Sequence, residues 1–364
     1  MSALFTPYQL KSVQLRNRVA VPPMCQYQAT DGLTNDWHQV HYGSLARGGA
    51  GLVIVEATAV APEGRISPAC TGLWNDEQVV GMAQIAQRIK AAGAVPGIQL
   101  AHAGRKASAN RPWEGDDHLA EGDPRGWETI APSAIPFGAH LPKVPREMTT
   151  ADISRVTGDF VAAARRALEA GFEWLELHFA HGYLAQSFFS PHANRRTDLY
   201  GGDAQRRARF LRETAVAVRK VWPEHLPFTA RFGVIEYDGN DEQTLSDAID
   251  VVKGFRQDGM DMLSVSMGFN IPDSRIPWGP AFLAPVAERV RREAGIPVAS
   301  AWGFAAPADA ERVVAEEQLD LVMIGRAHLA NPHYPYFLAK ELHKERPAWV
   351  LPESYAHWLS SGHQ

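Results

Sequence analysis

The sequence predicts an α/β fold, a (β/α)8 or TIM barrel, and three observations support this prediction. Short apolar runs alternate with longer amphipathic segments along the whole chain, which is the pattern of repeated βα units around a parallel sheet. Eight such apolar runs can be counted, and eight parallel strands close naturally into a barrel. A length of 364 residues also suits one α/β barrel with inserted loops. We therefore expect a single domain over residues 1–364.

The predicted strands are short and apolar, and turn residues flank most of them. They cover residues 18–21, 51–57, 95–100, 173–178, 228–232, 262–266, 298–301 and 321–324. Helical segments follow nearly every strand. Each strand and its following helix thus form one unit of the predicted barrel.

The segment 151–170 illustrates the predicted helices. Its apolar residues Ile153, Val156, Phe160, Ala164 and Leu168 recur at the spacing of one helix face. Thr149 and Asp152 resemble a capped start, and Gly171 stands where a helix usually ends. A second capped start is expected at Asp241.

Two segments lie outside the βα repeat. Residues 4–15 alternate like a short hairpin that contains Pro7, and we expect it to close the N-terminal mouth of the barrel. Residues 104–148 form a long insertion after the third strand, rich in Pro, Gly and Asp, and loops of this length usually carry function or oligomer contacts.

Composition excludes several classes of protein. A formal net charge of −5 with scattered arginines argues against binding of nucleic acid or an anionic membrane. The two cysteines, Cys25 and Cys70, form neither a disulfide framework nor a paired metal-ligand motif. No signal peptide and no apolar run of about 18 residues is recognisable. We expect a cytoplasmic protein.

The active site of a TIM barrel lies at the C-terminal ends of its strands, and the fourth predicted strand ends in His178, His181 and Tyr183. The imidazoles could donate hydrogen bonds to a carbonyl or nitro oxygen while Tyr183 supplies a proton. Metal binding would require further ligands, and Glu176, two residues before His178, could assist. The imidazoles could also be structural residues of the barrel.

Arg231 interrupts the apolar fifth strand, and alternation along the strand points it into the barrel. A buried guanidinium is costly without an anionic or carbonyl partner. An anionic cofactor would provide one, and an internal salt bridge with Glu176 would be the alternative.

Two further strand ends are rich in glycine: Ala301, Trp302 and Gly303 follow strand seven, and Gly325 and Arg326 follow strand eight. The loops after these two strands commonly bind phosphate in this fold, with backbone N–H groups and a cation as ligands. Glycine is also an ordinary turn residue at such positions.

Cys25 follows the first strand. It could be a buried apolar filler, a residue that adjusts a redox cofactor, or a nucleophile. No G-x-G-x-x-G motif joins a strand to a helix, so a Rossmann site is not expected. A nicotinamide would then have to bind in the same cleft as its hydride acceptor.

The chain resembles the Old Yellow Enzyme flavoproteins along essentially its whole length, in particular the bacterial xenobiotic reductases of the thermophilic-like subclass. The motifs that carry the resemblance cover residues 17–27, 99–106, 178–183, 187–191, 194–198 and 320–326. The resemblance implies an FMN-dependent, NAD(P)H-oxidising ene-reductase with ping-pong kinetics and no metal. Its acceptors would be α,β-unsaturated carbonyl compounds, with nitro compounds and nitrate esters as further candidates.

The resemblance also assigns residues to the cofactor. Those around FMN would be Pro23, Met24, Cys25, Ala57, Gln99, His178, Arg231, Ala301, Trp302, Gly303, Gly325 and Arg326. Gln99 would bind the pyrimidine edge, Arg231 would stabilise the anionic reduced flavin, and Cys25 would tune its potential.

For the substrate, the resemblance assigns His178 and His181 to the carbonyl oxygen and Tyr183 to protonation of the α carbon. Tyr27 and Trp302 would shape the pocket. The subclass is oligomeric and has a C-terminal arm, here residues from about 345 to 364. A dimer or tetramer would bring this arm to a neighbour's active site, where Trp358 would form a wall. Packing of Trp358 on its own barrel is the alternative. The rival function is a metal-dependent TIM-barrel hydrolase.

Overall fold

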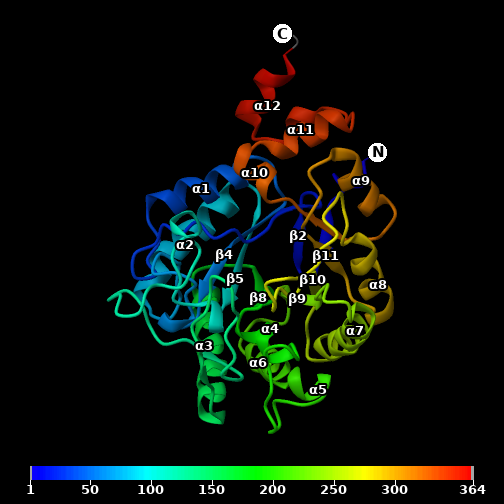
Figure 1. The fold of residues 1–364 in the computed structure, drawn as a ribbon. Helices are drawn as coiled ribbons and strands as arrows, with labels where there is room; N and C mark the ends of the chain where they lie inside the picture. Colours follow the sequence, from blue (N-terminus) through cyan, green and yellow to red (C-terminus); the bar gives the residue numbers. More distant parts are fainter. Residues whose placement is uncertain (1, 362–364) are drawn as a thin grey trace.

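A closed barrel of eight parallel strands forms the centre of the computed structural model, which describes residues 2–361 (Figure 1). The barrel strands are β3 (Val19–Val21), β4 (Leu52–Ala59), β5 (Val95–Ala101), β8 (Trp174–Phe179), β9 (Phe228–Ile235), β10 (Met262–Met267), β11 (Val298–Ser300) and β12 (Leu321–Met323). They neighbour one another in chain order, and β12 pairs with β3 to close the ring. Each predicted strand coincides with one of these, so the predicted fold class is confirmed.

The chain forms helices that surround the barrel on the outside, apart from the last two, which project from it (Figure 1). They are α1 (Asp36–Arg47), α2 (Glu77–Ala91), α3 (Thr150–Glu169), α4 (Leu184–Phe189), α5 (Ala204–Arg207), α6 (Arg209–Arg219), α7 (Asp241–Gln257), α8 (Ala284–Ala294), α9 (Pro307–Ala315), α10 (Arg326–Ala330), α11 (Tyr334–Glu341) and α12 (Glu353–Ser360). Short 3-10 turns lie at Pro62–Gly64, Gly104–Lys106, Pro112–Glu114 and Pro347–Val350. No helix within residues 2–361 combines the length and apolarity that crossing a membrane requires.

Helix α3 has the predicted start and end. Thr149 and Asp152 form a reciprocal capping box, and Gly171 adopts a φ of 89° just after the helix, a conformation that glycine tolerates without strain. Helix α7 starts at Asp241 with an acidic first turn, as predicted, but the predicted side-chain cap is wrong, because Asn240 precedes the helix without a capping hydrogen bond. The Asp241 carboxylate instead accepts a hydrogen bond from the Tyr237 backbone N–H at 2.7 Å.

The N-terminal hairpin closes one end of the barrel, as predicted. Strands β1 (Tyr8–Leu10) and β2 (Val13–Leu15) pair antiparallel. Leu10, Val13 and Leu15 belong to one buried cluster with Leu52 and Val95. Because Leu52 and Val95 are the first residues of their strands, the hairpin covers the N-terminal mouth and leaves the C-terminal mouth for the site.

The insertion between β5 and α3 is attached to the C-terminal face of the barrel. It contains the two-residue strands β6 (Ile130–Ala131) and β7 (Arg146–Glu147). The buried Arg105 donates hydrogen bonds to the backbone oxygens of Pro136 within the insertion and of Asn270 after β10. The insertion therefore adds walls to the rim of the barrel.

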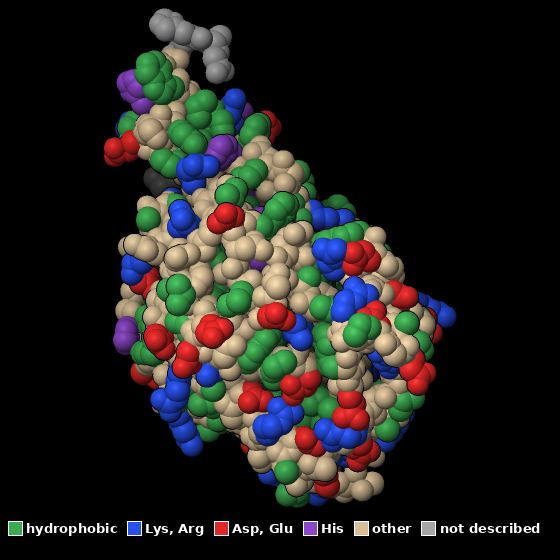
Figure 2. All heavy atoms as spheres, turned by 90° about the vertical axis from the view of Figure 1, so that its left-hand side faces the viewer, with side chains coloured by type: hydrophobic (Ala, Val, Ile, Leu, Met, Phe, Trp, Pro, Cys, Tyr) green, Lys and Arg blue, Asp and Glu red, His purple; other side chains and the backbone are tan. Residues whose placement is uncertain are grey.

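Helices α11 and α12 project from the barrel (Figure 1). Figure 2 shows apolar, histidine and charged side chains on this projection, and acidic and basic side chains interspersed over the body beneath it. Trp358 in α12 is 74% exposed, so the alternative that it packs on its own barrel is wrong. The arm was predicted to reach residue 364, and residues 362–364 lie outside the described part.

Candidate active site at the C-terminal mouth of the barrel

A cavity of about 300 Å³ opens at the C-terminal ends of β3, β11 and β12. Its lining includes ten of the predicted site residues or their neighbours: Pro22, Pro23, Met24, His181, Arg231, Ala301, Trp302, Gly303, Gly325 and Arg326. These residues are far apart in sequence, and closure of the barrel brings them together. The predicted phosphate loops and the predicted substrate histidine thus share one cavity.

The two glycine turns provide room in this cavity. Gly303 has a φ of 82°, and a Cβ there would lie 2.5 Å from the backbone oxygen of Gly279. A Cβ on Gly325 would lie 3.2 Å from the Met24 sulfur and narrow the cavity. Arg326 follows at the start of α10, and it forms no ion pair within 4.0 Å among residues 2–361. Backbone N–H groups that no Cβ shields, together with a guanidinium that forms no ion pair with a described residue, are suited to bind a terminal phosphate.

Arg231 lies in β9, is 4% exposed, and faces the cavity. Its Nε has no hydrogen-bond partner within the described residues. Glu176 attracts it electrostatically, but no oxygen of Glu176 lies within the 4.0 Å of an ion pair, so the alternative of an internal salt bridge is wrong. A buried guanidinium with an unsatisfied N–H indicates a missing acceptor.

Gln99 and Glu176 form the polar floor below Arg231. The Gln99 amide donates to Glu176 Oε1 at 2.7 Å, while Glu176 Oε2 is buried and has no partner within residues 2–361. Burial raises the pKa of Glu176 to about 7, although the positive charge of Arg231 acts to lower it. Within the described part of the chain, Glu176 Oε2 thus lacks a donor and Arg231 Nε lacks an acceptor, which fits the polar edge of an isoalloxazine ring.

His178 and His181 stand perpendicular to each other, with ring centroids 5.0 Å apart, and the Tyr183 ring lies 5.0 Å from that of His178. His178 is 4% exposed and its Nδ1 has no partner in the described part of the chain. Burial, and then the positive charge of Arg231, holds the pKa of both imidazoles well below the ordinary value. Both rings are therefore neutral at physiological pH.

Ser266 at the end of β10 orients His181. Its Oγ lies 2.7 Å from His181 Nε2, and it also accepts a hydrogen bond from Trp302 Nε1 at 3.4 Å. Since an indole N–H can only donate, the serine hydrogen is free to point at Nε2. This arrangement favours the tautomer of His181 that carries its proton on Nδ1.

His181 and Trp302 have φ angles of 64° and 81°, in the left-handed region that side chains rarely adopt. The two rings contact each other edge to face, with centroids 6.1 Å apart. Both side chains also hydrogen-bond to Ser266. The strained backbone at these two residues therefore indicates that function, rather than local propensity, fixes the positions of their side chains.

Tyr183 precedes α4 and is half-buried. Burial, and then the proximity of Cys25, raises the pKa of its phenol above the ordinary value. The group therefore keeps its proton across the physiological range. With Ala57, Tyr183 lines a second, much smaller cavity of about 10 Å³, so Ala57 lies on the Tyr183 side rather than in the main cavity.

Lys106 is a site residue to which the sequence reasoning gave no role. Its Nζ donates to the backbone oxygens of His181 and Phe269 at 2.8 and 2.7 Å and lies 5.7 Å from the centroid of the Tyr183 ring. Burial lowers its pKa to about 7. Lys106 thus holds the strained turn at His181 in place.

Cys25 is half-buried and Cys70 is buried, and both are free thiols. Burial, and then the proximity of Cys70, raises the pKa of Cys25 well above its ordinary value. A nucleophilic cysteine requires a lowered pKa, so these surroundings argue against that role.

Glu56 in β4 supports the segment of Cys25 and was also missed. Its buried carboxylate accepts the Gln26 backbone N–H at 2.9 Å and the Tyr42 hydroxyl at 2.8 Å. Burial raises its pKa to about 7. A charged residue inside an apolar strand, the signal used for Arg231, could have identified it.

Two predicted residues lie at the margins of the site. Tyr27 has a φ of 52° and contacts Trp113 of the insertion edge to face, with centroids 5.8 Å apart. Trp358 lies on the projecting arm. Within residues 2–361 no three His, Cys, Asp or Glu side chains group as metal ligands.

Comparison with known proteins agrees with this geometry. The model of the NADH:flavin oxidoreductase / NADH oxidase family matches residues 3–345. The NADPH dehydrogenase of Geobacillus thermodenitrificans is 42% identical over 343 residues, which cover 94% of this chain and 95% of that protein.

Solved structures of morphinone reductase are similar in three dimensions. One superposes with a TM-score of 0.80 at 27% identity and covers 100% of this chain and 98% of that one. Another, in complex with tetrahydroNAD, has a TM-score of 0.78 at 27% identity and covers 99% of both chains. The chain therefore belongs to the NADH:flavin oxidoreductase / NADH oxidase family, the FMN-dependent oxidoreductases of the Old Yellow Enzyme type.

Proposed function

We propose that the protein is an ene-reductase, which reduces the C=C bond of α,β-unsaturated carbonyl compounds with hydride from NAD(P)H. One observation carries the proposal: the neutral rings of His178 and His181 and the phenol of Tyr183 meet at the mouth of the barrel, beside the buried cation of Arg231. Nitro compounds and nitrate esters present similar oxygens and are further candidate acceptors.

Bound FMN would supply the hydride chemistry, taking hydride from the nicotinamide and delivering it to the alkene. Gly303, Gly325 and Arg326 would hold its phosphate, and Gln99 and Arg231 its polar ring edge. The other residues assigned to it are Pro23, Met24, Cys25, Ala57, His178, Ala301 and Trp302. The unsatisfied Nε of Arg231 and Oε2 of Glu176 support this assignment.

The two imidazoles would bind the oxygen of the acceptor. The Nδ1–H tautomer of His181, favoured by Ser266, is a donor, and His178 Nδ1 is unpartnered within residues 2–361. Each such hydrogen bond stabilises developing negative charge by about 1.5–3 kcal/mol. Binding the oxygen in this way withdraws electrons from the conjugated alkene and prepares its β carbon for hydride.

Tyr183 would then protonate the α carbon. Because burial raises the pKa of its phenol, the proton is present before reaction, and positioned proton donors contribute roughly 10²–10⁴ in rate. Lys106 fixes the turn next to this phenol. Cys25, a neutral thiol, would adjust the redox cofactor, and Tyr27 and Trp302 would shape the pocket.

The donor and the acceptor would occupy the same cleft in turn, so ping-pong kinetics follow. Stopped-flow measurement of the two half-reactions tests the proposal. Tyr183→Phe is expected to be reduced by NADPH at the wild-type rate but to reduce a cyclic enone at least about 100-fold more slowly. Equal loss in both half-reactions, or no enone reduction by the wild type, would refute the proposed role.

We also propose that the chain acts as one cytoplasmic FMN-binding domain in a homodimer or homotetramer, with Trp358 entering the neighbour's site. The 74% exposure of this large aromatic ring supports the proposal. Trp358→Ala is expected to change the KM for a bulky enone, with Trp349→Ala, also exposed at 44%, as the matched control. Equal KM values in both variants and the wild type would contradict it.

A further inference from the structure

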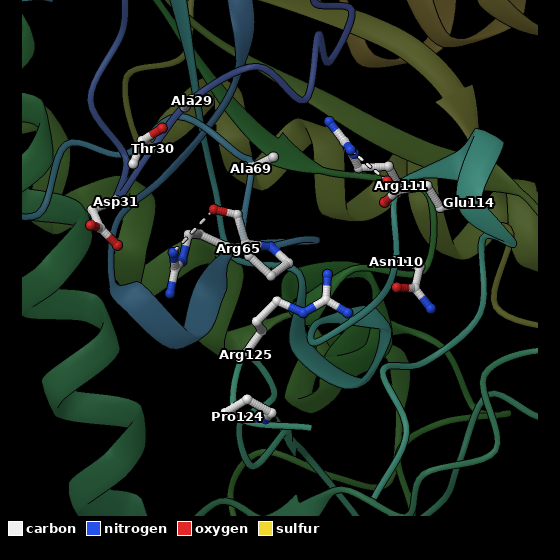
Figure 3. Close-up of a pocket in the computed structure, with 11 residues that line it drawn as sticks. Ala29, Thr30, Asp31, Arg65, Ala69, Asn110, Arg111, Glu114, Pro124 and Arg125 are labelled. Atoms are coloured by element: carbon white, nitrogen blue, oxygen red, sulfur yellow. Dashed lines mark hydrogen bonds and ion pairs between the residues drawn. The ribbon is translucent and has the colours of Figure 1, made fainter. Parts of the chain in front are cut away.

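A third cavity, of about 420 Å³, lies among the loops that follow β3 and β4 and the insertion that follows β5. Figure 3 shows three arginine side chains around it, Arg65, Arg111 and Arg125, with the carboxylates of Asp31 and Glu114 at opposite sides. We call this cavity the arginine pocket. Three guanidinium groups from separate segments converge there against two carboxylates, a combination suited to a ligand with both phosphates and hydroxyls.

Arg65 is the fixed member of the three. Its guanidinium carbon lies 4.8 Å from the ring centroid of Trp127 and 5.3 Å from that of Trp74. It donates to the backbone oxygen of Pro62 at 2.9 Å and forms no ion pair within 4.0 Å among residues 2–361. Its charge is therefore preorganised and not neutralised by a carboxylate.

Arg111 and Arg125 are the adaptable members. Arg111 pairs with Glu114, and Arg125 pairs with Asp123 at 2.6 Å. Arg125 is exposed and Arg111 is half-buried at the surface, and ion pairs in contact with solvent contribute little free energy. Each arginine can therefore turn from its carboxylate to a phosphate at small cost.

The arginine pocket adjoins the candidate active site. Arg65 also lines the small cavity that Tyr183 and Ala57 share. Trp113, which stands between Arg111 and Glu114 in sequence, contacts the ring of Tyr27. A ligand that reaches from Tyr183 past Tyr27 to the insertion would thus end in this pocket.

We propose that the arginine pocket binds the phosphate groups of the reduced nicotinamide dinucleotide while its nicotinamide ring lies at the barrel mouth. This inference rests on the proposed function. The chain has no G-x-G-x-x-G turn for the pyrophosphate, so the phosphates need another cationic site. Asp31 and Glu114 are placed to accept hydrogen bonds from ribose hydroxyls, as acidic residues do in other dinucleotide sites.

The test uses the double variant R111Q/R125Q of the full-length holoenzyme. Arg65 is left unchanged because it packs between two tryptophans. Arg206→Gln is the matched control, since Arg206 is an exposed arginine paired with Asp203 on α5. The double variant is expected to raise the KM for NADPH by roughly tenfold or more with kcat unchanged, and the KM of the control is expected to stay at the wild-type value.

Reduced nicotinamide mononucleotide, which lacks the adenylate phosphate groups, separates the pocket from the active site. It keeps only the phosphate on the nicotinamide side, so its KM is expected to rise less than that of NADPH in the double variant. If the double variant raises only the KM for NADPH, the pocket binds the 2′-phosphate. If it raises the KM for NADPH and for NADH equally, the pocket binds the pyrophosphate. An unchanged KM for NADPH, or an equal rise for the mononucleotide, would overturn the proposal.

A binding measurement distinguishes failure of this inference from failure of the proposed function. Calorimetric titration with 2′-phospho-ADP-ribose is expected to show roughly tenfold weaker binding to the double variant, and weaker binding to the wild type as salt increases. This result would support the pocket even if no enone were reduced. Equal affinity of the wild type and the double variant would overturn it.

Discussion

Removal of the Ser266 hydroxyl tests how the substrate-binding imidazole is held. In Ser266→Ala, His181 Nε2 loses its partner at 2.7 Å and Trp302 Nε1 loses its acceptor at 3.4 Å. A neutral hydrogen bond of this kind contributes about 0.5–1.5 kcal/mol. If that energy orients His181 toward the acceptor, the dissociation constant of the acceptor rises about 2- to 13-fold.

Stopped-flow re-oxidation of the reduced protein by a cyclic enone measures this constant directly. Ser264→Ala is the matched control, because Ser264 lies on the same strand, is buried, and its hydroxyl donates only weakly to the Met323 sulfur at 3.5 Å. Ser266→Thr retains the hydroxyl and is expected to recover most of the affinity. Equal dissociation constants in Ser266→Ala and Ser264→Ala would refute the orientation argument.

Three further predictions concern buried charges. Because the folded-state pKa of Glu56 is raised to about 7, its contribution to stability is fully present below its unfolded pKa near 4.3 and is lost as the pH rises through 7. Denaturant unfolding should therefore show that Glu56→Gln loses less stability between pH 5 and pH 8 than the wild type. The same change in the free energy of unfolding with pH in both proteins would contradict this. Arg231→Gln removes a buried cation with an unsatisfied Nε, so flavin fluorescence titration should show roughly 10- to 100-fold weaker FMN binding; unaltered affinity would remove Arg231 from the cofactor site. Lys106→Met leaves the carbonyls of His181 and Phe269 without their donor. Denaturant unfolding at pH 6 should show that the variant has a free energy of unfolding about 1–3 kcal/mol lower than the wild type. Equal stability of the variant and the wild type would contradict the prediction.

The barrel could be predicted because its strands are apolar on both faces. A parallel strand covered by helices outside and packed inside has no polar alternation, so the run 52–55 and its counterparts are recognisable without further information. The hairpin was recognisable from its alternation. The cap at Asp241 was not, because the competing hydrogen bond from the Tyr237 backbone depends on the path of a loop.

Residues of the candidate site could be predicted where a charged side chain interrupts an apolar strand, as Arg231 does. Supporting residues could not. Ser266 is an ordinary strand residue until barrel closure places it beside His181, and Lys106 acts on backbone oxygens from two distant loops. The arginine pocket also combines segments separated in the chain, so no local pattern marks it.

We propose that the imidazoles of His178 and His181 bind an electron-rich oxygen over the flavin. Titration with a phenol tests it most directly, because a phenolate held against oxidised flavin gives a long-wavelength charge-transfer band. The wild type is expected to develop this band with saturation, and a His178→Ala/His181→Ala variant that retains FMN is expected to lack it. A band of equal intensity and affinity in the double variant would contradict the account.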